Sequence, residues 1–233
     1  MKIMFVFAHP DDESFSSGGT IAELAKKGHE IALITATKGE KGELGDPPIT
    51  TKANLGKTRE QELRKAARIL GIRSVEFLGF IDGTLKNYVK DLKKKILVIL
   101  IKETPDIIVT FDRYGGSNHP DHIAISNVTT TSFREYMKRS KKRVCLYHTA
   151  VPRSYLRKYE KTNLSYTAFG KMRGTPDSNI TTIVDIKKTY PVKVRALQCH
   201  KTQKKDVDRF LKRVSYVDLK REFFELICEN SLI

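Results

Sequence analysis

The chain has 233 residues and a formal net charge of +16, with 43 lysines and arginines against 27 aspartates and glutamates. This length suits one domain with a sizeable core, and the composition excludes the disordered and collagen-like classes. The longest apolar runs, residues 3–8 and 96–101, are far shorter than the ~20 residues of a membrane helix. The first run also reads as a buried strand rather than a signal peptide, so we expect a cytoplasmic protein without a transmembrane segment.

Three interpretations of the positive charge compete. A solvated, lysine-rich surface is the simplest, followed by attraction for an anionic substrate or membrane surface, and then by nucleic-acid binding. The basic runs are scattered over residues 93–95, 138–143 and 201–205, without a zinc-finger or RNP-type aromatic motif. We therefore favour the first interpretation and a neutral small-molecule substrate, with no specific nucleic-acid partner; a homo-oligomer is possible.

Strands and helices alternate along the first 150 residues. Apolar runs predict strands over residues 3–8, 30–35, 75–78 and 106–111, and a 3.6-residue periodicity predicts helices over 20–27, 58–70, 92–102 and 123–138. Polar loops are expected over 9–19 and 38–51. Strands over 144–148 and 181–184, a helix over 191–200 and a possible edge strand over 222–227 follow. The pattern predicts an α/β fold: a Rossmann-like, mostly parallel sheet with helices on both faces, in a single domain covering 1–233.

Two clusters rich in histidine and aspartate follow predicted strands, AHPDDE at residues 8–13 and HPDH at 119–122. Ligands of open parallel sheets bind beyond the carboxyl ends of the strands. A catalytic zinc takes three histidine or carboxylate ligands and leaves one position for water. His9, Asp12 and His122 can supply these ligands, with Asp11 as general base and His119 stabilising the oxyanion or protonating the leaving amine.

These clusters resemble those of the PIG-L/LmbE-like de-N-acetylases, zinc enzymes that deacetylate N-acetylglucosaminyl lipids, thiol-precursor glycosides and chitin-derived sugars. Further matches, over roughly residues 1–205, are GGTIAELAKKGHE at 18–30, TATKGEKG at 35–42, Arg59-x-x-Glu62, LGFIDG at 78–83 and ALQCHKTQ at 196–203. The resemblance implies the same roles for His9, Asp11, Asp12, His119 and His122, with Zn²⁺ as the cofactor.

The resemblance also places Arg59 and Asp82 at positions that contact the sugar, and we predict His200 as a further substrate contact. Each has a structural alternative. Arg59 can pair with Glu62 on a helix surface, Asp82 can be a turn residue before a glycine, and His200 can be a partly buried helix histidine.

One segment departs from the family pattern. Some members have G-Y-G-H before the second histidine motif, with a tyrosine that helps to hold the oxyanion. Here Ser117 and Asn118 occupy that segment. Asn118 could replace the tyrosine as the hydrogen-bond donor to the oxyanion.

The predicted function is zinc-dependent hydrolysis of the N-acetyl (N-acyl) group of an amino sugar or glycoside. One alternative is an amidase of the same chemistry acting on a thiol-sugar conjugate. The other is a basic Rossmann-like nucleotide- or nucleic-acid-binding module. Two features weigh against the nucleotide-binding module. No GxGxxG motif follows the first strand, and two aspartates lie where phosphate would bind.

Overall fold

The computed structural model describes residues 1–141 and 143–229. Its main sheet has seven strands in the order β3-β2-β1-β4-β5-β9-β8. The strands are β1 (Lys2–Phe7), β2 (Glu30–Thr35), β3 (Ser74–Phe77), β4 (Ile107–Thr110), β5 (Cys145–Ala150), β8 (Thr182–Asp185) and β9 (Arg221–Glu229). The first five are parallel and β9 is antiparallel to both its neighbours. This arrangement confirms the predicted single-domain α/β fold.

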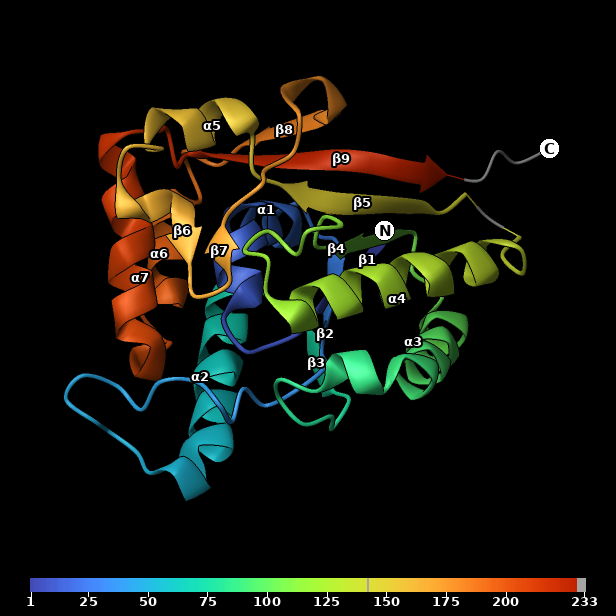
Figure 1. The fold of residues 1–233 in the computed structure, drawn as a ribbon. Helices are drawn as coiled ribbons and strands as arrows, with labels where there is room; N and C mark the ends of the chain where they lie inside the picture. Colours follow the sequence, from blue (N-terminus) through green and yellow to red (C-terminus); the bar gives the residue numbers. More distant parts are fainter. Residues whose placement is uncertain (142, 230–233) are drawn as a thin grey trace.

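Helices cover both faces of the sheet (Figure 1). On one face α1 (Asp12–Lys26), α2 (Leu55–Leu70) and α6 (Tyr190–Leu197) pack together, and on the other α3 (Val89–Glu103) packs against α4 (Pro120–Met137). The hairpin of β6 (Tyr166–Thr167) and β7 (Gly170–Lys171) lies with α5 (Arg153–Lys158) and α7 (Lys204–Leu211) near the carboxyl end of β5.

The core follows from this layering. Central parallel strands are covered on both sides, so they are apolar on both faces, and all residues of β1 from Ile3 to Phe7 are buried. Helix α2 buries Leu63, Ala66 and Leu70 in the same core.

Two sequence expectations were wrong. Residues 12–19 belong to α1 rather than to a loop. The glycine at position 19 allows close packing inside the helix, because a Cβ there would lie 2.4 Å from Ile186 Cδ1. The predicted edge strand, β9, instead lies inside the sheet between β5 and β8, and β8 forms the edge.

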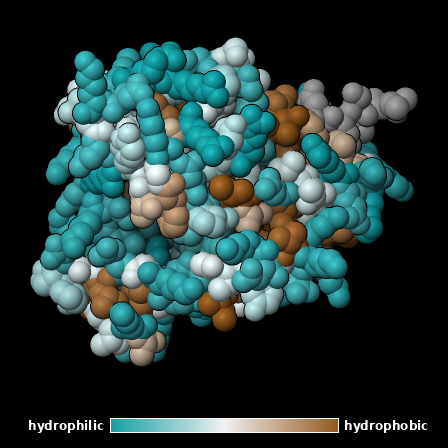
Figure 2. Space-filling model, viewed as in Figure 1, coloured by the Kyte–Doolittle hydropathy of each residue, from teal (hydrophilic) through white to brown (hydrophobic). Residues whose placement is uncertain are grey.

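The surface is predominantly hydrophilic on the face drawn in Figure 2, with hydrophobic side chains in small, separate patches. Among the described residues, none of the helices combines the length and the apolar character needed to span a bilayer.

Candidate active site

The two histidine–aspartate clusters meet where the sheet ends. β1 ends at Phe7, a four-residue turn follows, and α1 begins at Asp12. β4, which pairs with β1, ends at Thr110, and the following loop leads to α4, which begins at Pro120. Because both connections leave the carboxyl ends of adjacent strands, their side chains face each other.

The structure brings the three predicted metal ligands together. His9 Nδ1 lies 3.1 Å from His122 Nε2, and the Asp12 carboxylate lies 3.2 Å from His122 Nε2 and 3.7 Å from His9 Nδ1. A tetrahedral zinc ion with bonds of about 2.0–2.2 Å holds its ligands about 3.3–3.6 Å apart. The two facing histidine nitrogens lie close to this spacing, and Asp12 faces them with different oxygens, Oδ1 towards His122 and Oδ2 towards His9. The types of donor fit such an ion.

The outer nitrogens of both histidines are held by the protein, as is usual for metal-binding imidazoles. His122 Nδ1 lies 3.0 Å from the Gly115 carbonyl, which leaves Nε2 for a metal. His9 Nε2 lies 3.0 Å from Asp82 Oδ1 and 3.4 Å from Asp121 Oδ2, although hydrogen-bond alignment is poor.

A second cluster of potential ligands, His9, Asp82 and Asp121, lies on the far side of the His9 ring. Its carboxylates already accept backbone N–H groups: Asp82 from Lys41, and Asp121 from Gly83 and Leu85. This cluster therefore supports His9. His9 and His122 also form a potential ligand set with His119, so the Nδ1 side of the His9 ring offers Asp12 or His119 as the third ligand.

The pKa values of His9 and His122 also indicate that the space between them favours a cation. Burial would lower the pKa of His9, but the Asp121 and Asp82 carboxylates raise it to about 10. Burial and the charge on His9 lower the pKa of His122 to about 3. The His9–His122 pair thus holds one proton between the two nitrogens that face each other, and a metal ion would displace it.

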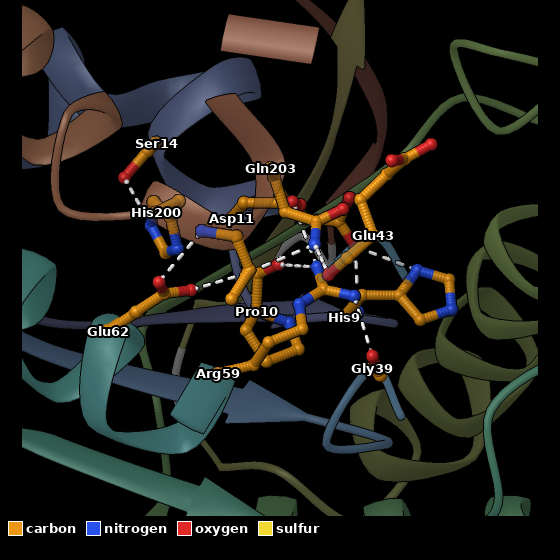
Figure 3. Close-up of polar contacts among 12 residues, drawn as sticks. His9, Pro10, Asp11, Ser14, Gly39, Glu43, Arg59, Glu62, His200 and Gln203 are labelled. Atoms are coloured by element: carbon orange, nitrogen blue, oxygen red, sulfur yellow. Dashed lines mark hydrogen bonds and ion pairs between the residues drawn. The ribbon is translucent and has the colours of Figure 1, made fainter. Parts of the chain in front are cut away.

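Asp11 occupies a strained turn beside these ligands. Its φ of 102° lies in the left-handed region, which a non-glycine residue adopts at a cost of about 1–3 kcal/mol. Arg59 Nη2 donates to the Asp11 carboxylate at 2.9 Å and to the Pro10 carbonyl at 2.6 Å, and Nη1 donates to Gly39 (Figure 3). Burial raises the pKa of Asp11, and the Arg59 charge opposes the rise. The Arg59 guanidinium therefore stabilises the turn at Pro10 and Asp11.

Behind the turn, Glu13 and His200 form a buried ion pair, 3.1 Å apart. Burial opposes their charges, yet each raises the charged population of the other: the pKa of Glu13 is lowered and that of His200 is raised. The other Glu13 oxygen accepts the Asp11 N–H at 3.1 Å. His200 is 1% exposed and does not belong to the described residues that line the cavity, so the structure places it behind the site.

His119 closes the other side of the centre. Its Nδ1 accepts the Asp121 N–H at 3.1 Å, which leaves Nε2 as the protonated nitrogen of the neutral ring. Burial and the charges on His122 and His9 lower the pKa of His119 to about 4. The ring of Phe169, from the β6–β7 hairpin, packs edge-on against it at 4.3 Å.

The Ser117–Asn118 segment connects the site to that hairpin. Asn118 Nδ2 donates to the Lys171 carbonyl at 2.7 Å, and Thr167 Oγ1 donates to the Ser117 carbonyl at 2.8 Å. Asn118 is thus engaged away from the metal ligands, whereas Ser117 Oγ lies 3.2 Å from His122 Nδ1.

A cavity of about 670 Å³ opens onto the centre. Its lining includes every predicted site residue except His200, namely His9, Asp11, Asp12, Arg59, Asp82, His119 and His122. Glu13 and Asp121 belong to the two motifs but were not among the predicted site residues. Their positions, adjacent to predicted ligands, were the available signal.

Comparison with known proteins agrees with this geometry. The family of GlcNAc-PI de-N-acetylases (PIG-L) matches residues 4–133. The chain belongs to this family. Relatives named 1D-myo-inositol 2-acetamido-2-deoxy-alpha-D-glucopyranoside deacetylase are 34% identical in Mycobacteroides abscessus (87% of this chain, 81% of the relative) and 34% identical in Thermomonospora curvata (87% and 80%). The predicted family is confirmed.

Solved structures share the fold at lower identity. The N,N'-diacetylchitobiose deacetylase of Pyrococcus horikoshii matches with a TM-score of 0.71 and 21% identity, over 97% of this chain and 83% of that one. A 4-carboxy-2-hydroxymuconate hydratase from Pseudomonas putida also matches, with a TM-score of 0.68 and 19% identity, over 99% and 97%. Because one fold carries both activities, the reaction must be argued from the site.

Proposed function

We propose that this PIG-L family member is a zinc-dependent hydrolase that removes the N-acetyl group of an amino sugar or glycoside. The observation that carries the proposal is the close approach of His9, Asp12 and His122 to one another, in a cavity that Asp11 also lines. The names of the relatives that are more than 30% identical support the same reaction.

When bound, zinc supplies a water of lowered pKa and polarises the acyl carbonyl. Asp11 takes the proton of the attacking water, a role that its raised pKa favours over that of an ordinary aspartate. His119 is neutral, since its pKa is lowered. Its Nε2–H therefore donates a hydrogen bond to the acyl oxygen as negative charge develops.

The leaving amine needs a proton before it departs. Asp11 carries a proton after the attack on the acyl carbon. His119 is neutral at neutral pH and therefore cannot act as the acid. We therefore assign the acid role to Asp11 as well, which returns it to the carboxylate. Acetate and a free amine leave the site.

The two alternatives differ in their support. A thiol-sugar conjugate amidase would use the same residues, and a substrate panel separates it. A nucleotide- or nucleic-acid-binding role is disfavoured because acidic residues Asp11, Asp12 and Asp82 line the cavity. Zinc as the metal, the cytoplasmic location and a homo-oligomer stay predictions.

The test is metal analysis of protein purified without added metal, together with amine release from N-acetylglucosamine, its disaccharides and its methyl glycoside. We expect about one zinc per chain and amine release that a chelator abolishes and zinc restores. A purified protein that holds no stoichiometric metal ion, or amine release that a chelator does not change, would contradict the proposal.

A further inference from the structure

The cavity is larger than its metal end. Beyond the residues of the two motifs, its wall continues along α5, β7, α7 and the first residues of β9. We call this part the distal lobe and define it by six apolar and aromatic lining residues: Tyr155, Phe169, Met172, Phe210, Leu219 and Phe223. None of them belongs to the motifs that define the family resemblance.

The aromatic rings of the lobe are held by ring contacts. Tyr155 packs edge-on against Phe223 at 5.0 Å, and Phe210 packs edge-on against Phe15 at 5.3 Å. Phe169 joins the lobe to the metal end through its contact with His119 at 4.3 Å. Fixed aromatic walls of this kind bind flat or bulky apolar groups with little loss of side-chain freedom.

Three cationic side chains among these rings, Lys193, Arg209 and Arg213, each bond to protein atoms. Lys193 Nζ is 2.6 Å from Glu222 and donates to the Phe15 carbonyl at 2.9 Å. Arg213 Nη2 donates to the Leu164 carbonyl at 3.0 Å, and Arg209 Nη2 donates to the Asn163 and Tyr166 carbonyls. Of these three side chains, only Arg209 and Arg213 keep a buried donor without a partner, the Nε atom of each. A ligand rich in hydroxyl groups would therefore lose hydrogen bonds with water along the six apolar side chains and find few free donors to replace them.

We propose that the distal lobe is an aglycone subsite for an apolar group, so that the preferred substrate is an N-acetylated amino sugar linked to a cyclic or aromatic hydrocarbon aglycone. This inference rests on the proposed function for the placement of the sugar at the metal end. It differs from what the names of the listed relatives describe, because those names specify the polyol inositol.

A matched pair of substrates tests it: the cyclohexyl and the inosityl glycosides of N-acetylglucosamine in one anomeric form, with the methyl glycoside as reference. The two rings differ only in hydroxyl groups. For the zinc-loaded enzyme we expect kcat/KM for the cyclohexyl glycoside to exceed that for the inosityl glycoside by about tenfold or more. Equal values, or a preference for the inosityl glycoside, would overturn the subsite.

Variants locate the effect. Phe210→Ala should reduce the cyclohexyl-to-methyl ratio of kcat/KM by about tenfold, and Phe210→Leu, which keeps an apolar side chain, should retain most of it. Tyr216→Ala is the control, since Tyr216 is 42% exposed and is not among the described lining residues. An equal loss with all three glycosides in Phe210→Leu would show a structural role for Phe210 and contradict the subsite.

The outcomes separate the subsite from the function. If the methyl glycoside is not deacetylated by the zinc-loaded protein, the proposed function fails. Calorimetry with the cyclohexyl and inosityl glycosides then still tests the lobe. Tighter binding of the cyclohexyl glycoside that Phe210→Leu retains and Phe210→Ala loses would support it, and equal binding of the two glycosides would refute it.

Discussion

At the scale of single residues, the proposed chemistry depends on Asp11. Asp11→Asn keeps the shape of the side chain but cannot accept a proton. We expect the variant to keep its metal and to lose roughly 100- to 10,000-fold in kcat. Metal content and amine release, measured on the same preparation, check this. Near-normal turnover at full metal occupancy would show that Asp11 is not the base.

Glu13 positions Asp11 by accepting its backbone N–H, and His200 holds Glu13. Glu13→Ala removes that acceptor and should lower kcat by roughly 100-fold while KM changes little, as small displacements of a reacting group do. Glu13→Gln retains an oxygen acceptor and should restore much of the loss. If the two variants are equally impaired, or if both lose their metal, the carboxylate does more than position the turn.

The motifs sufficed to predict the residues that lie together at the candidate metal site, because AHPDDE and HPDH follow adjacent parallel strands. They did not show what lies behind it. His200 was predicted to contact substrate, and the structure gives it a buried carboxylate partner from a residue 187 positions away. A sequence names a histidine but not the direction in which its ring points.

At the scale of elements, α1 shows how packing overrides helix propensity. Gly19 lies inside the helix, where replacement by alanine ordinarily stabilises by about 0.5–1 kcal/mol. Here the added Cβ would meet Ile186 at 2.4 Å, so Gly19→Ala should instead lower the free energy of unfolding by about 1–3 kcal/mol. Urea unfolding measures this, with Gln61→Ala at an exposed position of α2 as control. A stabilised Gly19→Ala variant would contradict the close packing.

His148 links β5 to α4, where its Nε2 lies 3.0 Å from Thr130 Oγ1. Burial lowers the pKa of His148 from 6.5 to about 4. The unfolded chain therefore takes up this proton first, and stability is lost as the pH falls from 6.5 towards 4. We expect the loss from this group to be about 1 kcal/mol at pH 5.5 and about 2–3 kcal/mol at pH 4.5, relative to pH 7.5.

The measurement is the free energy of unfolding in urea at those three pH values, for the wild type and His148→Gln. On acidification the variant should lose less stability than the wild type, and the difference should be about these amounts. Parallel curves for the two proteins would mean that His148 titrates normally in the folded state.

The alternation of apolar runs was enough to predict the parallel part of the sheet, because its central strands β1, β2 and β4 are buried on both faces. β9 was misplaced for a different reason. Its sequence, rich in phenylalanine, is compatible with an edge or an inner position, and the short β8 that covers it offers only four residues of pattern.

At the scale of the whole molecule, the charge of +16 contrasts with the acidic centre. Most lysines lie on the hydrophilic surface, whereas Asp11, Asp12 and Asp82 line the cavity. Arg209 and Arg213 also line it, with their Nη2 atoms bonded to backbone carbonyls. The question is whether this positive charge attracts substrate or only keeps the protein in solution.

A salt series on kcat/KM answers it. Screening acts over about 8–10 Å at moderate ionic strength, so diffusional steering weakens before contacts at the metal do. For the neutral cyclohexyl and methyl glycosides, we expect kcat/KM to change by less than about twofold between low and moderate salt, because neither carries a charge to be steered. A carboxylate-bearing glycoside, run beside them, should lose kcat/KM with salt while its kcat stays constant. If that anionic glycoside is also clearly preferred at physiological salt, the positive charge guides substrate to the cavity and does more than keep the protein in solution.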